Sequence, residues 1–315
     1  MSETSHYTTQ KSLSKDGHVQ SALGRTPGQF CDTQEVRAIV ARGVTCLSAG
    51  VPVHLCGPAG IGKTALAVRM AAVFDRPMSF LTGHEGLSAE DFIGQQVGHS
   101  EFAVVDRYIQ SVRRKQTQSR IEWRDAILAE AMREGHVLVY DEFTRASPAT
   151  NVLLLSVLEE GVLVSPGGMN GHSYVRAHPE FRIILTSNPA EYVAVNAAPD
   201  ALLDRMVTIR LTGYCCETET EIVRATTGLE IKTARRVVEL VARLRASHPG
   251  VLLPSMRTSI LIGKIVRSLP TMGSPSDQQL AEIVATVVRG RAPEVARNTI
   301  NEAVQATAFD EERTS

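Results

Sequence analysis

The feature that most constrains the fold is the eight-residue stretch GPAGIGKT at residues 57–64. An apolar run at residues 51–56 precedes it, and a helical pattern at residues 65–74 follows it. A strand that ends at a glycine-rich turn leaves several backbone N–H groups facing one concavity, and the next helix adds the positive end of its dipole. The pattern therefore predicts a nucleoside-triphosphate site, rather than a turn that only connects a strand to a helix.

We call residues 57–64 the phosphate loop, and each of them is a candidate contact for the nucleotide. Lys63 would place its ammonium on the β- and γ-phosphates, and Thr64 would offer its hydroxyl to Mg²⁺. The candidate nucleotide-binding residues are Gly57, Pro58, Ala59, Gly60, Ile61, Gly62, Lys63 and Thr64.

Two adjacent carboxylates, Asp141 and Glu142, follow the continuous apolar run at residues 136–140. Such a run is typical of a central parallel strand that is buried on both faces. Carboxylates at the end of a buried strand are costly without a cationic partner, and a magnesium–triphosphate would supply one. We expect Asp141 to hold the metal, directly or through water, and Glu142 to orient and polarise the attacking water. The alternative is a strand end that is simply exposed to solvent.

A third buried strand, predicted at residues 181–185, ends in TSNP. Asn188 in this stretch is a candidate sensor of nucleotide state, because an amide can hydrogen-bond both the γ-phosphate and the attacking water. The alternative is a turn, since Asn-Pro is a common turn dipeptide.

Two arginines are candidates for charge stabilisation. Arg205 ends a short predicted helix before the strand at residues 207–211, where it could enter a neighbouring subunit's site as an arginine finger. The alternative is a local surface pair with Asp204, which would contribute little. Arg257 begins a helix after Pro254 and could reach back to the γ-phosphate.

The remaining patterns give a coarse outline of the chain. We expect an irregular insertion at residues 82–98, after a second strand. Residues 113–120 are expected to form a basic loop that is either a solvated connection or a pore or partner surface. We also expect a helix at residues 121–135 that ends at a glycine, and a glycine-rich hairpin at residues 161–175.

Composition limits the partners and the compartment. Lys and Arg number 33 against 34 Asp and Glu, so the net charge of −1 gives no global basic field for nucleic acid or an anionic membrane. The five cysteines lack a pairing or metal-ligand spacing, which suits a reducing cytoplasm. No signal peptide or membrane-span pattern is present in the sequence, so we expect a soluble, cytoplasmic protein.

The domain organisation follows from shifts in pattern along the 315 residues. Residues 1–30 read as a disordered tail, because they are polar and lack apolar periodicity. Residues 31–212 carry the strand and loop motifs of an α/β parallel-sheet domain. Residues 213–305 contain only helical patterns and predict a smaller helical domain, and residues 306–315 read as a second tail.

The ordered set GPAGIGKT, VLVYDE, TSNP, LLDR and PSMR resembles the motifs of AAA+ ATPases, which belong to the P-loop NTPase class. The insertions expected around residues 84–98 and 161–175 resemble the helix-2 and pre-sensor insertions of the MoxR-type branch. Within that branch, the runs at residues 104–112, 137–163, 178–192 and 201–209 resemble the gas vesicle protein N family. The resemblance covers most of residues 31–265.

The resemblance implies roles for single residues. Gly57, Gly62, Lys63 and Thr64 would contact the phosphates and Mg²⁺. Asp141 and Glu142 would form Walker B, Asn188 sensor 1, Arg205 the finger and Arg257 sensor 2. Two stretches depart from the family pattern, Gly83–Glu85 and Val193–Val195. Both lie in the presumed insertion and loop regions, so the departures concern partner contacts more than ATP chemistry.

The resemblance also implies an activity and partners. It implies an ATPase with ATP and Mg²⁺ as cofactors and a homo-oligomeric, hexameric ring. It also implies a role in gas vesicle assembly and growth through shell or accessory proteins. It further implies a cytoplasmic location, including association with gas vesicles. No basic stripe with interleaved aromatic residues suggests nucleic acid.

Two alternatives remain open from the sequence. The first is a MoxR-type activase that inserts metal into, or remodels, another enzyme of the carboxylase or nitric oxide reductase type. The second is a nucleotide-dependent scaffold with little turnover.

Overall fold

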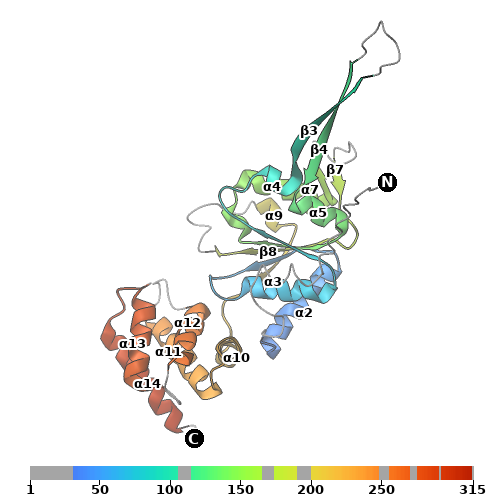
Figure 1. Ribbon diagram of the computed structural model, residues 1–315. Helices are drawn as coiled ribbons and strands as arrows, with labels where there is room; N and C mark the ends of the chain where they lie inside the picture. Colours follow the sequence, from blue (N-terminus) through green and yellow to red (C-terminus); the bar gives the residue numbers. More distant parts are fainter. Residues whose placement is uncertain are drawn as a thin grey trace, which may run out of the picture.

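The computed structural model describes residues 31–105, 115–164, 174–189, 200–247, 255–269, 275–290 and 292–313. Figure 1 shows an α/β part, a two-stranded hairpin that projects from it, and a separate group of helices. The tail expected at residues 1–30 and the stretch Val193–Val195 lie outside the described residues. Within the described ranges, none of the helices combines the length and apolarity that a bilayer crossing needs.

The α/β part is built on a five-stranded sheet in the order β2-β5-β8-β1-β9, and its strands all pair in parallel. The strands are β1 (Val53–Cys56), β2 (Met78–Thr82), β5 (Val137–Asp141), β8 (Arg182–Ser187) and β9 (Val207–Arg210). Since β8 lies between β5 and β1, the carboxyl ends of these three strands meet at one edge of the sheet. The expected α/β parallel-sheet fold is confirmed.

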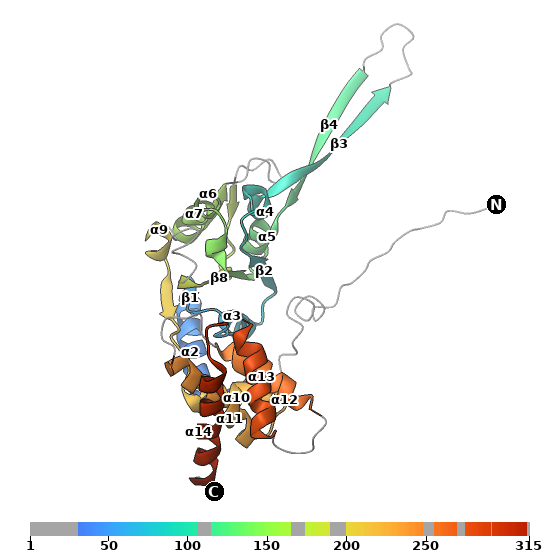
Figure 2. The ribbon, with the colours of Figure 1, turned by 90° about the vertical axis from the view of Figure 1, so that its left-hand side faces the viewer.

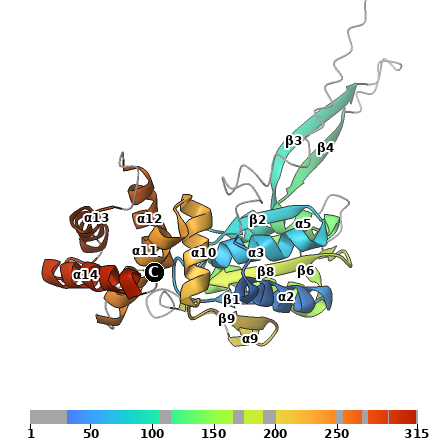
Figure 3. The ribbon, with the colours of Figure 1, turned by 90° about the horizontal axis from the view of Figure 1, so that it is seen from below.

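Helices cover both faces of this sheet (Figure 1), and in the view from below α2 (Gln34–Ser48) and α3 (Lys63–Ala71) lie across one of these faces (Figure 3). The strand β5 shows why, because Val137 and Val139 pack into one hydrophobic core, whereas Leu138 and Tyr140 pack into another. Alternate residues of a strand face opposite sides, and here both sides are apolar. The first core includes α2 (Gln34–Ser48) and α3 (Lys63–Ala71). The second includes α4 (Ala89–Ile93), α5 (Ile127–Glu134), α7 (Leu153–Glu160) and α9 (Asp200–Leu203).

The first insertion is a long antiparallel hairpin, which the sequence analysis did not predict. Its strands are β3 (Gly94–Val105) and β4 (Lys115–Asp125), and they extend away from the sheet (Figures 1 and 2). The expected basic loop is wrong for residues 115–120, which belong to β4, while residues 113–114 lie outside the described chain. The helix expected from residue 121 begins only at Ile127. Trp123 has helical spacing to Ile127, but pairing with β3 decides the conformation there.

The second insertion agrees with the expected hairpin at its two ends. β6 (Val162–Val164) and β7 (Tyr174–Arg176) pair antiparallel, and the residues that connect them, 165–173, lie outside the described chain. Two helices, α6 (Pro148–Asn151) and α7, precede this hairpin.

The C-terminal part is helical and has its own hydrophobic core. Its helices are α10 (Cys216–Thr227), α11 (Ile231–Ser247), α12 (Met256–Arg267), α13 (Asp277–Arg289) and α14 (Arg297–Arg313). This separate core supports the proposed domain division at residue 213. The tail expected from residue 306 is wrong, because α14 continues to Arg313 and buries Thr307. Ile300 and Val304, four residues apart, anchor α14 in the core, while the charged residues after Asp310 gave the segment its tail-like composition.

Candidate nucleotide site

The phosphate loop connects β1 to α3, and its glycines are required by its backbone. Gly60 and Gly62 have φ values of 82° and 93°, in the left-handed region that disfavours side chains. A Cβ on Gly57 would lie 2.5 Å from the carbonyl oxygen of Leu211. Ile61 is buried in the core beneath the loop and anchors it. The loop therefore presents its backbone N–H groups at the start of α3, as an anion site needs.

The ammonium of Lys63 lies inside this loop. Its Nζ donates to the carbonyl oxygens of Gly57 and Pro58, at 2.8 and 3.0 Å. The side chain is buried, so the positive charge is held at the loop rather than spread into solvent. A concentrated positive charge beside several backbone donors fits a polyphosphate group.

The hydroxyl of Thr64 and the carboxylate of Asp141 lie next to each other although they are 77 residues apart in the chain. Thr64 Oγ1 lies 2.8 and 2.9 Å from the two carboxylate oxygens of Asp141. Thr186 also donates to Asp141, at 2.6 Å. Hydroxyl and carboxylate oxygens are the ligands that Mg²⁺ prefers, usually with phosphate and water completing its shell. The residues present therefore fit a magnesium–nucleotide complex held by Thr64 and Asp141.

Glu142 occupies a strained backbone position at the end of β5. Its φ is 53°, which is uncommon for a residue with a side chain. The backbone N–H of Glu142 donates to Thr186 Oγ1 at 3.0 Å, and its carboxylate pairs with Arg145 at 3.0 Å. A Cβ on Gly83 would lie 2.2 Å from the carbonyl oxygen of Glu142, so the chain turns at Glu142 directly against a glycine.

Asn188 is brought to the same edge of the sheet by β8. It is buried, with 7% of its surface exposed. The carbonyl oxygen of its neighbour Ser187 accepts from the N–H of Gly57 at 3.3 Å, which places the end of β8 beside the start of the phosphate loop. Asp141, Glu142 and Asn188 thus lie at the carboxyl ends of neighbouring strands, beside the phosphate loop.

Arg257 is carried to the phosphate loop by the start of α12. A Cβ on Gly60 would lie 2.7 Å from Ser255 Oγ and 3.0 Å from Arg257 Cβ. The side chain of Arg257 is exposed at this contact between the helical part and the loop. A Cβ on Gly62 would lie 4.0 Å from the hydroxyl oxygen of Tyr214. Tyr214 is half-buried, and this burial raises the pKa of its hydroxyl far above the usual range.

Arg205 is not brought to the phosphate loop of its own chain. It comes just before β9, whose first residue Val207 is level with Val53, the first residue of β1. Gly57 follows the other end of β1, about 15 Å away along the strand. The guanidinium of Arg205 instead pairs with Glu159, at 2.7 and 3.0 Å, and donates to the carbonyl of Ala201. The alternative pair with Asp204 is therefore replaced by a pair with Glu159.

Thr186 is a site residue that the sequence analysis did not single out. Its hydroxyl contacts both the Asp141 carboxylate and the Glu142 backbone. The available signal was its place in TSNP at the end of a buried strand, but its partners depend on β8 lying beside β5.

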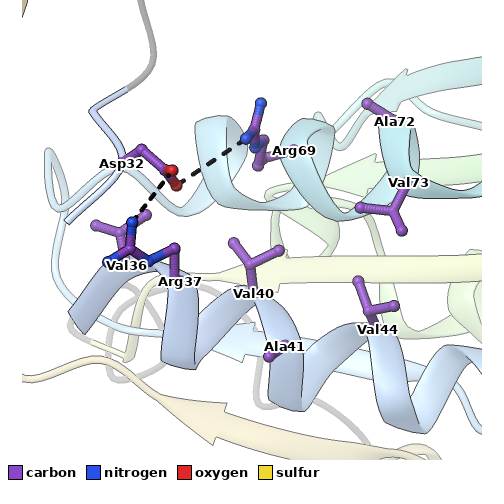
Figure 4. A pocket seen from close by; sticks show the side chains of 9 residues that line it. All are labelled: Asp32, Val36, Arg37, Val40, Ala41, Val44, Arg69, Ala72 and Val73. Carbon is purple, nitrogen blue, oxygen red and sulfur yellow. Dashed lines mark hydrogen bonds and ion pairs between the residues drawn. The ribbon is translucent and has the colours of Figure 1, made fainter. Parts of the chain in front are cut away.

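A separate groove of about 430 Å³ lies between α2 and α3 (Figure 4). It is apolar in the middle, and Asp32 at one end lies 3.5 Å from Arg37 and 4.0 Å from Arg69. None of the motif residues of the nucleotide site lines it.

Comparisons with known proteins agree with this geometry. Residues 52–206 match the family described as AAA domain (dynein-related subfamily). Gas vesicle ATPase GvpN of Ancylobacter aquaticus is 38% identical over 286 residues, which cover 90% of this chain and 80% of that protein. Gas vesicle ATPase GvpN of Haloferax mediterranei is 42% identical over 217 residues, which cover 69% of this chain and 62% of that protein.

A more distant relative is Protein CbbQ of Hydrogenophilus thermoluteolus. It is 26% identical over 212 residues, which cover 67% of this chain and 72% of that protein. The similarity to the two GvpN proteins is therefore higher. The aligned region spans less than two thirds of the Haloferax protein, so the similarity leaves part of that relative unmatched.

Proposed function

Because this chain belongs to the gas vesicle ATPase GvpN family of AAA+ proteins, we propose that it uses ATP hydrolysis to remodel proteins during gas vesicle assembly and growth. The shell or accessory proteins of the gas vesicle are its clients in this proposal. The protein works in the cytoplasm, at or near the growing vesicle.

The observation that carries the proposal is the position of Arg205. It lies where the strands of the sheet begin, whereas the phosphate loop lies where they end. One chain therefore does not bring its finger to its own site. In a ring, the Arg205 of one subunit completes the site of the next, and hydrolysis becomes tied to assembly. A hexamer is the ring that we propose.

The chemistry follows from the positions of the side chains. The loop N–H groups and Lys63 bind the phosphates. Thr64 and Asp141 would hold Mg²⁺, which would neutralise phosphate charge. Glu142 orients the attacking water, and Asn188 hydrogen-bonds that water and the γ-phosphate. Arg257 links the helical part to the same phosphate, so that ATP and ADP favour different placements of the helices.

The test uses Glu142→Gln, which we expect to bind ATP but to hydrolyse it about 10²-fold more slowly or worse. The tagged variant is incubated with ATP in an extract of the native host, and captured proteins are identified by mass spectrometry. Recovery of a gas vesicle shell or accessory protein supports the proposal. Lys63→Ala, which loses nucleotide binding, is the matched control and should capture none of these proteins.

The second candidate is an activase for another enzyme, and the similarity to Protein CbbQ favours it. The nucleotide site would be the same, and only the client would differ. Capture of a metalloenzyme in place of gas vesicle proteins would overturn the first proposal in favour of this one. ATP-dependent assembly with negligible phosphate release would instead indicate a scaffold.

A further inference from the structure

A buried histidine lies within the sheet, on β1 between β8 and β9. His54 is the second residue of β1 and is 1% exposed. It occupies the sheet face that carries Tyr140 and Leu185, and no step of the ATPase chemistry described above uses it. A buried polar ring needs hydrogen-bond partners, because leaving it unsatisfied costs more than an apolar side chain of similar size.

His54 has a partner on each neighbouring strand. Its Nε2 lies 2.7 Å from Ser187 Oγ on β8, and its Nδ1 lies 3.0 Å from Thr208 Oγ1 on β9. Burial and the charge of Arg210 lower the pKa of the ring to about 4, so the imidazole is neutral at neutral pH. A neutral ring has one donor and one acceptor nitrogen, and each hydroxyl can take the complementary part.

The ring also packs against the segment that follows Glu142. The centroids of His54 and Phe143 are 5.4 Å apart, with an interplanar angle of 87°. Such an edge-to-face arrangement is directional and restrains both rings.

The three partners described above, Ser187, Thr208 and Phe143, are each close in sequence to a residue of the ATPase machinery. Ser187 precedes Asn188, Phe143 follows Glu142, and Thr208 lies three residues after Arg205 on the short strand β9. One side chain therefore touches the segments that carry the sensor, the water-orienting carboxylate and the finger. The segments with Ser187 and Phe143 lie where the strands end, next to the phosphate loop. The segment with Thr208 lies near the start of β9, at the other end of the strands.

We propose that His54 is a positioning residue that couples the nucleotide state of a subunit to the finger that the subunit presents to its neighbour. A displacement of Asn188 or Glu142 moves Ser187 or Phe143. The rigid ring of His54, which is hydrogen-bonded through both nitrogens, passes that displacement to Thr208 and β9. This inference rests on the proposed action of Arg205 in trans.

The test separates the subunit that donates the finger from the subunit that hydrolyses ATP. Glu142→Gln subunits keep Arg205 but hydrolyse ATP very slowly. Arg205→Ala subunits keep Glu142 but offer no finger to their neighbour. Mixed in equal amounts, they should show ATPase activity above that of either variant alone. No activity in this mixture would contradict the trans finger itself, which is a separate outcome from the ones that test His54.

His54→Leu is then added to the Glu142→Gln donor only. We expect the activity of the mixture to fall at least about fivefold, because small displacements of a finger residue are costly to phosphoryl transfer. Thr208→Val in the same donor removes only the β9 partner and should cause a similar fall, which keeps the test decisive if His54→Leu folds poorly. Unchanged activity with either folded donor overturns the proposal.

The control donor carries Met132→Ala, a large-to-small change in the same hydrophobic core that belongs to none of the three segments. Its thermal midpoint is expected to fall as well, but its activity in the mixture should stay within about twofold of the unmodified donor. If Met132→Ala reduced the mixture's activity as much as His54→Leu does, the effect would be general core destabilisation, and the coupling role would be rejected.

Discussion

The hydroxyl of Thr64 donates to the carboxylate of Asp141, with its oxygen 2.8 and 2.9 Å from the two carboxylate oxygens. This contact joins the first turn of α3 to the end of β5. The two groups are separated by 77 residues, and they meet because β8 and β1 place the ends of the central strands side by side. A metal site made in this way depends on the charge of Asp141 as well as on its oxygens.

Asp141→Asn tests that dependence. The amide oxygen can still accept from Thr64 and Thr186, so we expect the fold to be retained. Loss of the negative charge should weaken Mg²⁺ binding, raising the Mg²⁺ concentration for half-maximal ATPase activity by about tenfold or more. A magnesium titration of the ATPase rate at fixed ATP measures this, and an unchanged midpoint would remove Asp141 from the metal site.

Gly83→Ala tests the strained turn at Glu142. A Cβ at residue 83 would lie 2.2 Å from the Glu142 carbonyl oxygen, so the turn has to move. We expect a loss of about 1–3 kcal/mol in the free energy of unfolding and a fall in kcat, while the affinity for ATP stays within about twofold. Gly86→Ala, where a Cβ would meet only His84 at 3.5 Å, is the matched control. Equal kcat values for the two variants would contradict the role of this contact.

Much of the nucleotide site was predictable because its residues belong to contiguous motifs at the ends of apolar runs. Lys63, Thr64, Asp141 and Asn188 each follow or begin an element whose pattern is strong in the sequence. Thr186 and His54 were not predictable in the same way. Their functions depend on which strands become neighbours, and a single sequence does not specify that β8 lies between β5 and β1.

The fold shows the same limit. The central strands are continuous apolar runs in the sequence, so their positions agreed with expectation. The hairpin β3–β4 did not, because Trp123 and Ile127 match a helical spacing while the strand pairing is a long-range interaction. For α14, the charged residues near the C-terminus predicted a tail from residue 306, although the helix that Ile300 and Val304 hold in its core continues to Arg313.

Arg205→Ala tests the intersubunit site. We expect ATP binding to be retained and kcat to fall by about 10³-fold, the lower range for losing an arginine finger. For the wild-type protein, activity per subunit should rise with protein concentration as rings form. Glu159→Gln removes the partner of Arg205 in its own chain but leaves the guanidinium, and it should keep activity within about twofold, since such exposed pairs contribute little. Equal activity per subunit in dilute and concentrated wild-type samples would exclude a trans finger.

The stability of the protein should depend on pH through His54. Its pKa is about 4 in the folded chain against 6.5 as the ordinary value, because burial and Arg210 disfavour the charged ring. Between these two values the unfolded chain binds a proton that the folded chain does not, so this contribution is fully present above pH 6.5 and is lost as the pH falls toward 4.

From pH 7.5 to pH 5.0, the wild-type free energy of unfolding should therefore fall by about 2 kcal/mol more than that of His54→Leu. Urea unfolding of both proteins at pH 7.5, 6.0 and 5.0 measures the difference. The gap between the two curves should narrow or reverse on acidification, because the leucine variant has no ring to protonate in its unfolded state. Parallel curves would mean that the ring is protonated equally in both states, and His54 would then not be the neutral bridge between β8 and β9.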